Sequence, residues 1–215
     1  MDARPVDRRT KPGRRREIAE AALQVMAEYG LAATTNSRVA EAVGITASAV
    51  YVHFKNRQEL LEAAMDVLVE RIQSWHGRSS NPDVGTRLRE IGDCHASFLA
   101  GELGGFVAPS FEFIASPPGL GLAQRFGSRI REPFENLTGI VDEGKAQGSI
   151  RPDLDSRVVA WELIMFAWAE DVARLIGLDE FVQDGISRQI LGILLDHATA
   201  TDTLGVEPAR GGDPR

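Results

Sequence analysis

Cysteine is nearly absent from this sequence, because Cys94 is the only one in 215 residues. A single cysteine excludes an internal disulfide and any zinc site built on cysteines. Long apolar runs are also missing: no span of 18 apolar residues occurs, so we expect no transmembrane helix and no membrane partner. The first 16 residues are nearly all polar, so we expect no signal peptide. Together these absences predict a cytoplasmic protein.

Positive charge is scarce overall, since the net charge is −7, and this at first argues against a nucleic-acid partner. The distribution reverses that argument. Residues 1–57 hold ten Lys and Arg against six Asp and Glu, a net charge of +4, and the remaining residues carry −11. A basic head on an acidic body can orient the head toward phosphate. The hydrophobic fraction of 43% is enough to build a proper core.

The stretch from Asn36 to Lys55 predicts a helix, a tight turn and a second helix. Val39 and Val43 lie four residues apart and share one helix face. Gly44 can leave a helix with positive φ at no steric cost, and Thr46 can cap the next helix. The apolar residues expected to fill the angle between the helices are Val39, Val43, Ile45, Val50 and Phe54. This spacing is typical of the helix-turn-helix that places a helix in the DNA major groove.

An ordinary αα-hairpin inside a helical bundle is the alternative interpretation of this stretch. An amphipathic helix is predicted over residues 14–29, with a basic arm before it, and both favour the DNA-binding interpretation. Residues 1–13 carry three arginines and Lys11 among prolines and glycine, which predicts a flexible arm. Such an arm either follows phosphates and the minor groove or is a solvated tail.

These residues resemble the N-terminal domain of TetR-type (tetracycline-repressor-like) transcriptional regulators. The resemblance rests on Thr34-Thr35, Val39-Ala40, Gly44-Ile45-Thr46 and, as its most specific part, the run Tyr51 to Leu60, YVHFKNRQEL. It covers about the first quarter of the chain, and the remainder matches only in length, helicity and placement. The resemblance implies a homodimeric repressor that a ligand releases from DNA, without catalytic activity.

Most candidate DNA-binding residues lie at the starts of the two helices of the motif, and the others follow along the second helix to Lys55. Thr46 at a helix N-terminus suits a phosphate oxygen, Ser48 can hydrogen-bond to bases, and Ala47 can touch a thymine methyl group. For His53 and Lys55, contact with the phosphate backbone is what the resemblance implies. The full set is Thr35, Ser37, Arg38, Thr46, Ala47, Ser48, Tyr51, His53 and Lys55.

The sequence departs from the family pattern in the second helix of the motif. Members of the family often carry a basic residue where Ala47 stands and a threonine where Ala49 stands. We therefore expect light direct readout of bases, with more of the affinity coming from Arg38 and the arm. The alternatives are that both alanines are plain helix formers, that Tyr51 only packs and that His53 makes a hydrogen bond at the helix surface.

The whole chain is predicted to be all-α, with about nine helices and no strand. We expect four parts: a flexible basic arm (1–13), a DNA-binding domain (14–57), a helical ligand-binding and dimerisation domain (58–199) and a disordered tail (200–215). Helices of the larger domain are predicted over residues 56–75, 83–100, 106–115, 120–147, 156–176 and 179–199. Pro133 is expected to kink or split the helix over 120–147. The helix starting near residue 56 is expected to act as a lever between the domains.

Many aromatic residues fall on few helices of the larger domain, which suggests an apolar cavity with a few polar groups. The candidate ligand-binding residues are His95, Phe98, Phe106, Phe111, Glu112, Phe126, Trp161, Met165 and Trp168. The alternative for each aromatic residue is ordinary core packing.

The last two predicted helices have more apolar surface than the core of a monomer needs. Packed against the same pair from a second chain, they would form a four-helix interface and present two motifs to a near-palindromic site. The candidate interface residues are Val158, Leu163, Phe166, Ile186, Ile190, Ile193 and Leu194. The alternative is a fully intramolecular core.

Enzyme functions find no support in the residue pattern. Asp93, Cys94 and His95 do not match a metal-ligand spacing, and adjacent helical residues point about 100° apart. We expect no catalytic residues, no metal and no cofactor. The sequence thus predicts a DNA-binding transcriptional regulator, a repressor released by an apolar small molecule. The alternative is a helical protein that binds or scavenges small molecules and has a non-functional DNA head.

Overall fold

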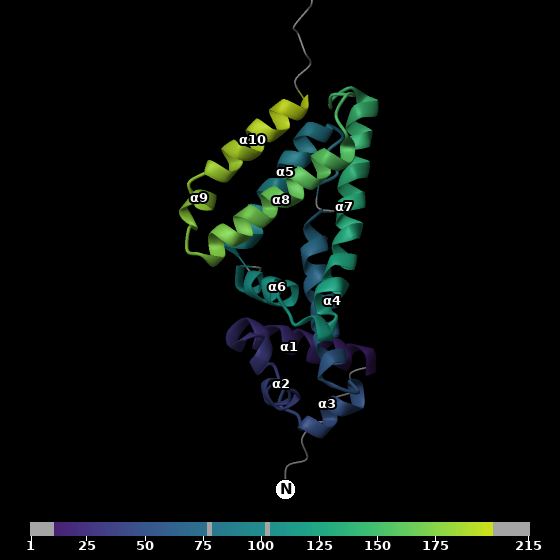
Figure 1. The fold of residues 1–215 in the computed structure, drawn as a ribbon, viewed down its shortest axis with the longest axis vertical. Coiled ribbons are helices and arrows are strands. Elements are labelled where there is room, and N and C mark those ends of the chain that lie inside the picture. The colour runs from purple at the N-terminus through teal and green to yellow at the C-terminus, as the bar shows by residue number, and fades with distance from the viewer. Residues whose placement is uncertain (1–10, 77–78, 102–103, 200–215) are drawn as a thin grey trace, which may run out of the picture.

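The computed structural model describes residues 11–76, 79–101 and 104–199, which fold into helices without a strand among them (Figure 1). Two short 3-10 helices precede α6 and α7, at Gly104–Phe106 and Pro118–Leu120. The α-helices are α1 (Lys11–Ala33), α2 (Asn36–Ala42), α3 (Ala47–His53), α4 (Arg57–His76), α5 (Val84–Ala100), α6 (Val107–Ile114), α7 (Leu122–Gln147), α8 (Ser156–Leu175), α9 (Glu180–Gln183) and α10 (Ile186–Thr199). The all-α class and the predicted number of about nine helices are confirmed.

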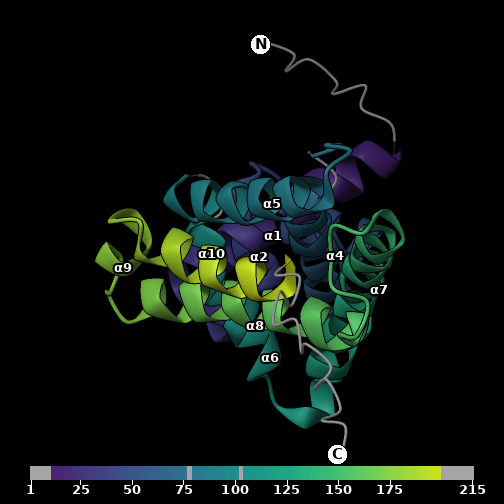
Figure 2. The same ribbon diagram turned by 90° about the horizontal axis from the view of Figure 1, so that it is seen from above.

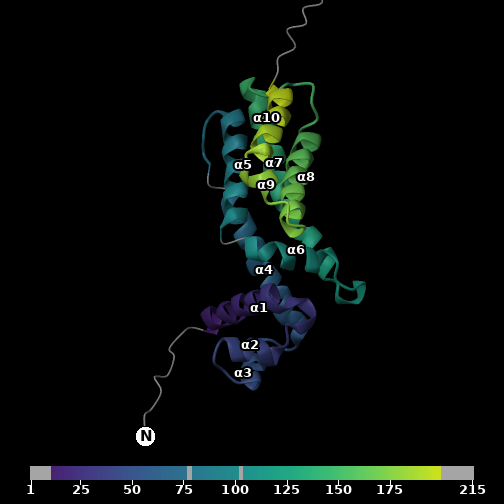
Figure 3. The same ribbon diagram turned by 90° about the vertical axis from the view of Figure 1, so that its left-hand side faces the viewer.

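The helices lie in two groups that α4 connects. Figure 3 shows α1, α2 and α3 at one end and α5, α7, α8 and α10 at the other, with α6 next to α1. Seen from above in Figure 2, α8 and α10 run side by side and α5 covers the opposite side of α10. None of the helices in the described ranges combines the length and the apolar character that crossing a membrane requires.

The buried side chains of α1, α2 and α3 pack together with the start of α4 and form one end of a core that continues through the molecule. Ile18, Ala22 and Met26 recur at four-residue steps along α1, so they form one apolar stripe. Short helices such as α2 and α3 are marginal alone and owe their stability to this packing. The buried side chains at the junction are Ile18, Ala22, Met26, Val39, Val50, Phe54, Leu60 and Leu61.

The turn between α2 and α3 has the predicted helix-turn-helix geometry. Gly44 adopts a left-handed φ of 67°, and the Ile45 N–H donates to the Ala40 carbonyl at 2.9 Å. Thr46 caps α3, because its hydroxyl accepts the Ala49 N–H at 3.2 Å. Thr35 caps α2 in the same way, accepting from the Arg38 N–H at 3.3 Å. Both helices begin after a threonine because its hydroxyl accepts a backbone N–H of the first turn that has no carbonyl acceptor within the helix.

Three predicted boundaries differ from the structure. The helix expected from residue 14 begins at Lys11, so residues 11–13 are helical; residues 1–10 of the arm and the tail at 200–215 lie outside the described residues. Pro133 does not split α7, because its missing N–H removes only one hydrogen bond from a long helix. The helix predicted over 179–199 is two helices, α9 and α10, separated at Gly185, whose φ of 77° no regular helix allows.

Two glycines of α7 lie in opposite environments. A methyl group at Gly144 would lie 2.5 Å from Ile150 Cγ1 and 2.8 Å from Val84 Cγ1, both on buried side chains. Gly139, in the same helix, has no atom within 4 Å of that position. Alanine is the better helix former at both sites, by about 0.5–1 kcal/mol. Only Gly144 is therefore required by close packing.

We predict that Gly144→Ala lowers the free energy of unfolding by about 1–3 kcal/mol, the usual effect of overpacking. The matched change Gly139→Ala should raise it by about 0.5 kcal/mol, because only the helix propensity changes there. Thermal or urea unfolding of both variants measures the difference. Equal effects at the two positions would contradict the packing of α7 against α5.

Candidate DNA-binding surface and internal cavity

The exposed face of α3 carries hydroxyl groups at its N-terminal end. Thr46, Ser48 and Tyr51 are exposed, and the hydroxyl oxygens of Thr46 and Ser48 lie 2.8 Å apart. Tyr51 is 58% exposed, which is more than a tyrosine that serves only packing needs. Hydroxyl groups at a helix N-terminus, together with free backbone N–H groups, suit phosphate oxygens and base edges.

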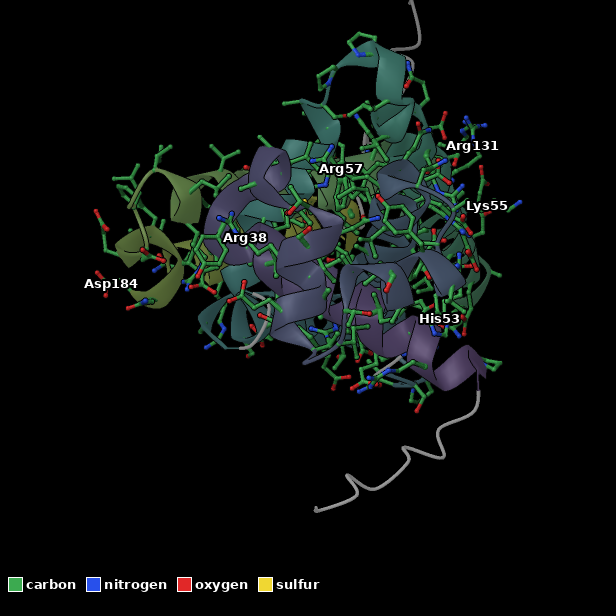
Figure 4. All side chains as sticks on the ribbon, turned by 90° about the horizontal axis from the view of Figure 1, so that it is seen from below. Arg38, His53, Lys55, Arg57, Arg131 and Asp184 are labelled. Atoms are coloured by element: carbon green, nitrogen blue, oxygen red, sulfur yellow. The ribbon has the colours of Figure 1, made fainter. Side chains whose placement is uncertain are left out.

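Ala47 and His53 are less available than the other predicted residues of α3. Ala47 is half-buried against the core. His53 is half-buried, and its Nδ1 atom is fully buried without a hydrogen-bond partner among the described residues. Lys55 follows α3 and is exposed, close to His53 on one side of the face that Figure 4 shows.

The start of α2 brings three of the predicted residues together. Thr35, Ser37 and Arg38 are exposed and line one shallow groove with Ala33 and Glu41. Figure 4 shows Arg38 on the opposite side of the lower face from His53 and Lys55.

The Arg38 guanidinium is held in place although it is exposed. Its central carbon lies 4.5 Å from the centre of the Tyr29 ring, and it donates to the Ala33 carbonyl at 3.3 Å. A stacked arginine loses less conformational entropy when it binds phosphate, since it is already ordered.

An arginine of α1, which the sequence analysis did not single out, fixes the end of α3. Arg15 lies 4.2 Å above the Phe54 ring, donates to the His53 carbonyl at 2.5 Å and pairs with Glu59 at 3.1 Å. The Lys55 N–H also donates to Glu59, at 2.8 Å. The Lys55 N–H and the Arg15 charge lower the pKa of the Glu59 carboxyl despite its partial burial. Spacing along the chain gave no signal for a contact between residues 15 and 53.

The second group of helices, together with α4 and α6, surrounds a partly open apolar cavity of about 100 Å³. That volume is several times what one water molecule needs. Six of the nine residues predicted for a ligand line it, namely His95, Phe98, Phe106, Phe111, Phe126 and Trp168. Leu68 and Ile72 of α4 line it as well, together with Ser110 and Ile114 of α6.

The three other predicted ligand residues do not line the cavity. Trp161 and Met165 lie on the outer face of α8, with 42% and 54% of their surface exposed. Leu163 and Phe166 of α8, which we predicted for the dimer interface, line the cavity together with Trp168. The two faces were exchanged because α8 is apolar nearly all round, so its periodicity does not tell inside from outside.

Glu112 lies on the side of α6 that faces α1. Its Oε2 accepts the Leu31 N–H at 2.6 Å. That N–H is free because Gly30, with φ of 82° and ψ of 166°, interrupts the helix before it. A methyl group at Gly30 would lie 3.0 Å from Glu112 Oε1, so the backbone requires glycine here for both conformation and space. Glu112 therefore joins the cavity-bearing helices to the DNA-binding end.

One end of the cavity is polar, and the sequence analysis found only one of its three charged residues. His95 Nε2 lies 3.5 Å from Asp171 Oδ1, 3.6 Å from Glu170 Oε2 and 3.2 Å from the Ala167 carbonyl. Burial opposes the charged imidazole, but Asp171 and Glu170 together raise the pKa of His95. Burial likewise raises the pKa of Glu170, against the opposing effect of His95. The sequence did carry a signal for the two acids, because Glu170 and Asp171 are adjacent and directly follow the apolar stretch of α8.

The outer faces of α8 and α10 form an exposed apolar surface. Four of the predicted interface residues, Val158, Ile186, Ile190 and Ile193, lie on it with 38–69% exposure. Leu194 is half-buried beside them. Trp161 and Met165 belong to the same surface rather than to the cavity. We call this set the α8–α10 face.

Comparison with known proteins gives the same picture. Residues 18–64 match the family model described as "Bacterial regulatory proteins, tetR family". The HTH-type transcriptional repressor KstR2 of Mycolicibacterium smegmatis is 31% identical over 160 residues, which cover 68% of this chain and 72% of that protein. The fatty acid metabolism regulator protein of Bacillus subtilis is 27% identical over 146 residues, 66% of this chain and 73% of that protein. FadR from Bacillus subtilis, solved in complex with stearoyl-CoA, has a TM-score of 0.68 at 23% identity, covering 83% of this chain and 96% of that chain.

The family match spans the part of the chain that contains the helix-turn-helix, and the resemblance proposed from the sequence is confirmed. The similarity to KstR2 extends well beyond the first quarter of the chain. The similarity to solved structures shows the same arrangement of helices. This chain belongs to the tetR family of bacterial regulatory proteins and is a DNA-binding transcriptional regulator.

Proposed function

We propose that this regulator is a dimeric repressor, without catalytic activity, that a small molecule in the cavity releases from a near-palindromic operator. The observation that carries the proposal is that α4 and α6 each contact both ends of the molecule. Each helix lines the cavity at one point and packs on α1 at another. A change in cavity shape therefore acts directly on the orientation of the DNA-binding end. That a relative of the same fold, FadR, was solved with stearoyl-CoA supports a ligand for this cavity.

The DNA-binding unit that we propose is formed by residues 14–57 with the first turns of α4. Its contacts come from the exposed hydroxyl groups of α3, from Arg38 on α2 and from Lys55. Apart from Lys55, the predicted residues of α3 and its end carry no fixed charge. Most of the attraction to phosphate then comes from charged groups outside α3, such as Arg38. Contacts of this kind position α3 on the DNA but add no base specificity.

The path through α6 is short. Phe111 of α6 faces the cavity, and the adjacent Glu112 holds the Leu31 N–H. The Leu31 carbonyl accepts from Arg57 at the start of α4, and Arg57 also donates to the Thr34 carbonyl at 2.7 Å. Three helix ends thus share one hydrogen-bond network. A ligand that shifts α6 would change all of them together.

The path through α4 is a rigid lever. Two arginines of α7 hold the middle of the helix, since Arg125 and Arg129 pair with Asp66 at 2.9 and 2.8 Å. A ligand that moves α7 away from the cavity would tilt α4 and its N-terminal end. Ligand binding then shifts the population between DNA-binding and released states, with a coupling of about 1–3 kcal/mol.

The α8–α10 face supports the dimer. Monomers rarely expose contiguous apolar surface beyond a few hundred square ångströms. Pairing this face with its symmetry copy would form a four-helix interface and fix the spacing of two α3 helices. Successive major grooves lie about 34 Å apart, so the spacing decides whether both helices bind at once.

The direct test is a mobility shift of the purified protein with the DNA upstream of its own gene, at two salt concentrations. We expect selective binding that weakens steeply with salt, because neutralised phosphates release counterions. Lys55→Ala should weaken binding and reduce the slope of log affinity against log salt by about one. Tyr51→Ala should weaken binding with the dimer intact.

Arg131→Ala is the matched control for Lys55→Ala, since it removes the same charge from an exposed position of α7, outside the helix-turn-helix. It should leave operator affinity unchanged. Salt-insensitive binding, or no binding by a folded dimer to upstream DNA at either salt, would contradict the repressor proposal. The protein would then be better described as a helical protein that binds small molecules and has a non-functional DNA-binding domain.

The α6 connection predicts a defined effect of Glu112→Ala. The Leu31 N–H loses its acceptor, which costs about 1–3 kcal/mol locally, so the Leu31 amide should exchange hydrogen faster. Operator affinity should fall because the α1 and α4 ends are less ordered. Glu112→Gln keeps an acceptor oxygen and should lie between the wild type and Glu112→Ala.

Glu135→Ala on the exposed side of α7 is the control for the loss of a carboxylate. It should change neither the Leu31 exchange rate nor operator affinity. Wild-type behaviour of Glu112→Ala in both measurements would rule out the α6 path and leave α4 as the sole connection.

The dimer is tested on its most exposed residue. Ile193 is 69% exposed on the α8–α10 face, and Ile193→Glu would place a charge in the proposed interface. We expect a monomer in sedimentation velocity at micromolar concentration, with weaker operator binding. Val52→Glu is matched in exposure, at 68%, but lies on α3 and should leave the dimer intact. Dimers of Ile193→Glu as stable as the wild type would place the interface elsewhere.

A further inference from the structure

The charged residues at the polar end of the cavity restrict which ligands the cavity can bind. His95 on α5 faces Glu170 and Asp171 on α8, with nitrogen–oxygen distances of 3.6 and 3.5 Å. All three residues line the cavity, whose other walls are almost wholly apolar. His95 and Glu170 are 9% and 4% exposed, so solvent compensates little of their charge. The arrangement confines a charged group to one end of an otherwise apolar space.

The charges at this end do not balance within the described part of the chain. One imidazolium, that of His95, faces two carboxylates. The nearest further pair, Asp93 of α5 and Arg188 of α10, neutralises itself at 2.8 Å. With His95 protonated and both carboxyls ionised, one negative charge is in excess, and burial without a matching counter-charge is what raises the pKa of Glu170. A buried excess charge is unfavourable unless a counter-charge or a hydrogen-bond donor reaches it.

One carboxylate oxygen of this cluster has no hydrogen-bond donor next to it in the described ranges. Glu170 Oε2 is fully buried and has no hydrogen-bond partner among the described residues. His95 Nε2 approaches it only to 3.6 Å and donates better to the Ala167 carbonyl at 3.2 Å. A carboxylate oxygen only accepts, so its missing partner is a donor.

Aromatic side chains line the same cavity. Phe98, Phe166 and Trp168 line the cavity together with His95 and Glu170. The faces of aromatic rings attract cations and disfavour anions, and the effect grows where water is excluded. A carboxylate or phosphate group here would meet the two carboxyl groups of Glu170 and Asp171 in largely aromatic surroundings.

We propose that the cavity selects an amphiphilic amine, an apolar body with a protonated amino group that donates to Glu170 and Asp171. The apolar body would lie between α4, α6 and α7, where Ile72, Phe111 and Phe126 line the cavity. This inference rests on the proposed function of the cavity as the ligand site and names the chemical class of its ligand.

The test compares three probes with one apolar chain and different head groups: octylamine, octanol and octanoate. Isothermal titration of the full-length protein should give a Kd for octylamine at least tenfold below that for octanol. Octanoate should bind more weakly than octanol. Equal affinity for the three probes, or tightest binding of octanoate, would overturn the proposal.

Glu170→Gln is the decisive variant, since it keeps the size of the side chain and removes its charge. It should raise the Kd for octylamine toward that for octanol and leave the octanol value unchanged. Glu162→Gln makes the same change on the exposed side of α8 and should leave both values unchanged. If Glu170→Gln does not fold, Asp171→Asn takes its place with the same expectation. Octylamine binding unaffected by these cavity variants would overturn the proposal.

Operator binding in the presence of each probe separates this inference from the proposed function. If all three probes bind equally and release the operator, amine selection is wrong while ligand-released repression holds. If octylamine binds selectively and operator affinity does not change, amine selection holds and release is wrong. If none of the probes binds, amine selection is wrong, and the mobility shift with upstream DNA then judges the proposed function alone.

Discussion

The architecture depends on the burial of one helix in two places. The first turns of α4 supply Leu61 to the core that holds α1, α2 and α3, and Leu68 further along lines the cavity. Arg125 and Arg129 pair with Asp66 between these points, so α7 fixes the helix along its length. A packed helix moves as a rigid body more readily than it bends. The position of the DNA-binding end is therefore set by the same contacts that shape the cavity.

A second connection uses a backbone group instead of a core. Gly30 takes the chain out of α1, and this leaves the Leu31 N–H without a helical acceptor. Glu112 provides that acceptor from α6, and a charged acceptor makes a stronger hydrogen bond than a carbonyl. Its neighbour Phe111 faces the cavity. Adjacent residues of one short helix thus contact the cavity and the group of α1, α2 and α3.

The two functional regions differ in how they use charge. The proposed DNA-binding face offers hydroxyl groups and ordered cations such as Arg38, held by Tyr29, which suit a polyanion. The cavity keeps its charge at one buried end, where His95 does not fully compensate Glu170 and Asp171. Low solvent access strengthens that charge. In the function that we propose, attraction to DNA and selection of a ligand use separate parts of the molecule.

The sequence by itself determined the features that depend on neighbours along the chain. Gly44 and Thr46 predicted the turn and the start of α3, because glycine conformation and helix capping act within a few residues. Only the tertiary structure decided what depends on distant segments. Glu112 meets Leu31 across 81 positions, and the apolar circumference of α8 left Trp161 and Phe166 equally suited to either face until neighbouring helices covered one of them. Periodicity reports that a face is apolar, but contacts between remote helices decide what that face touches.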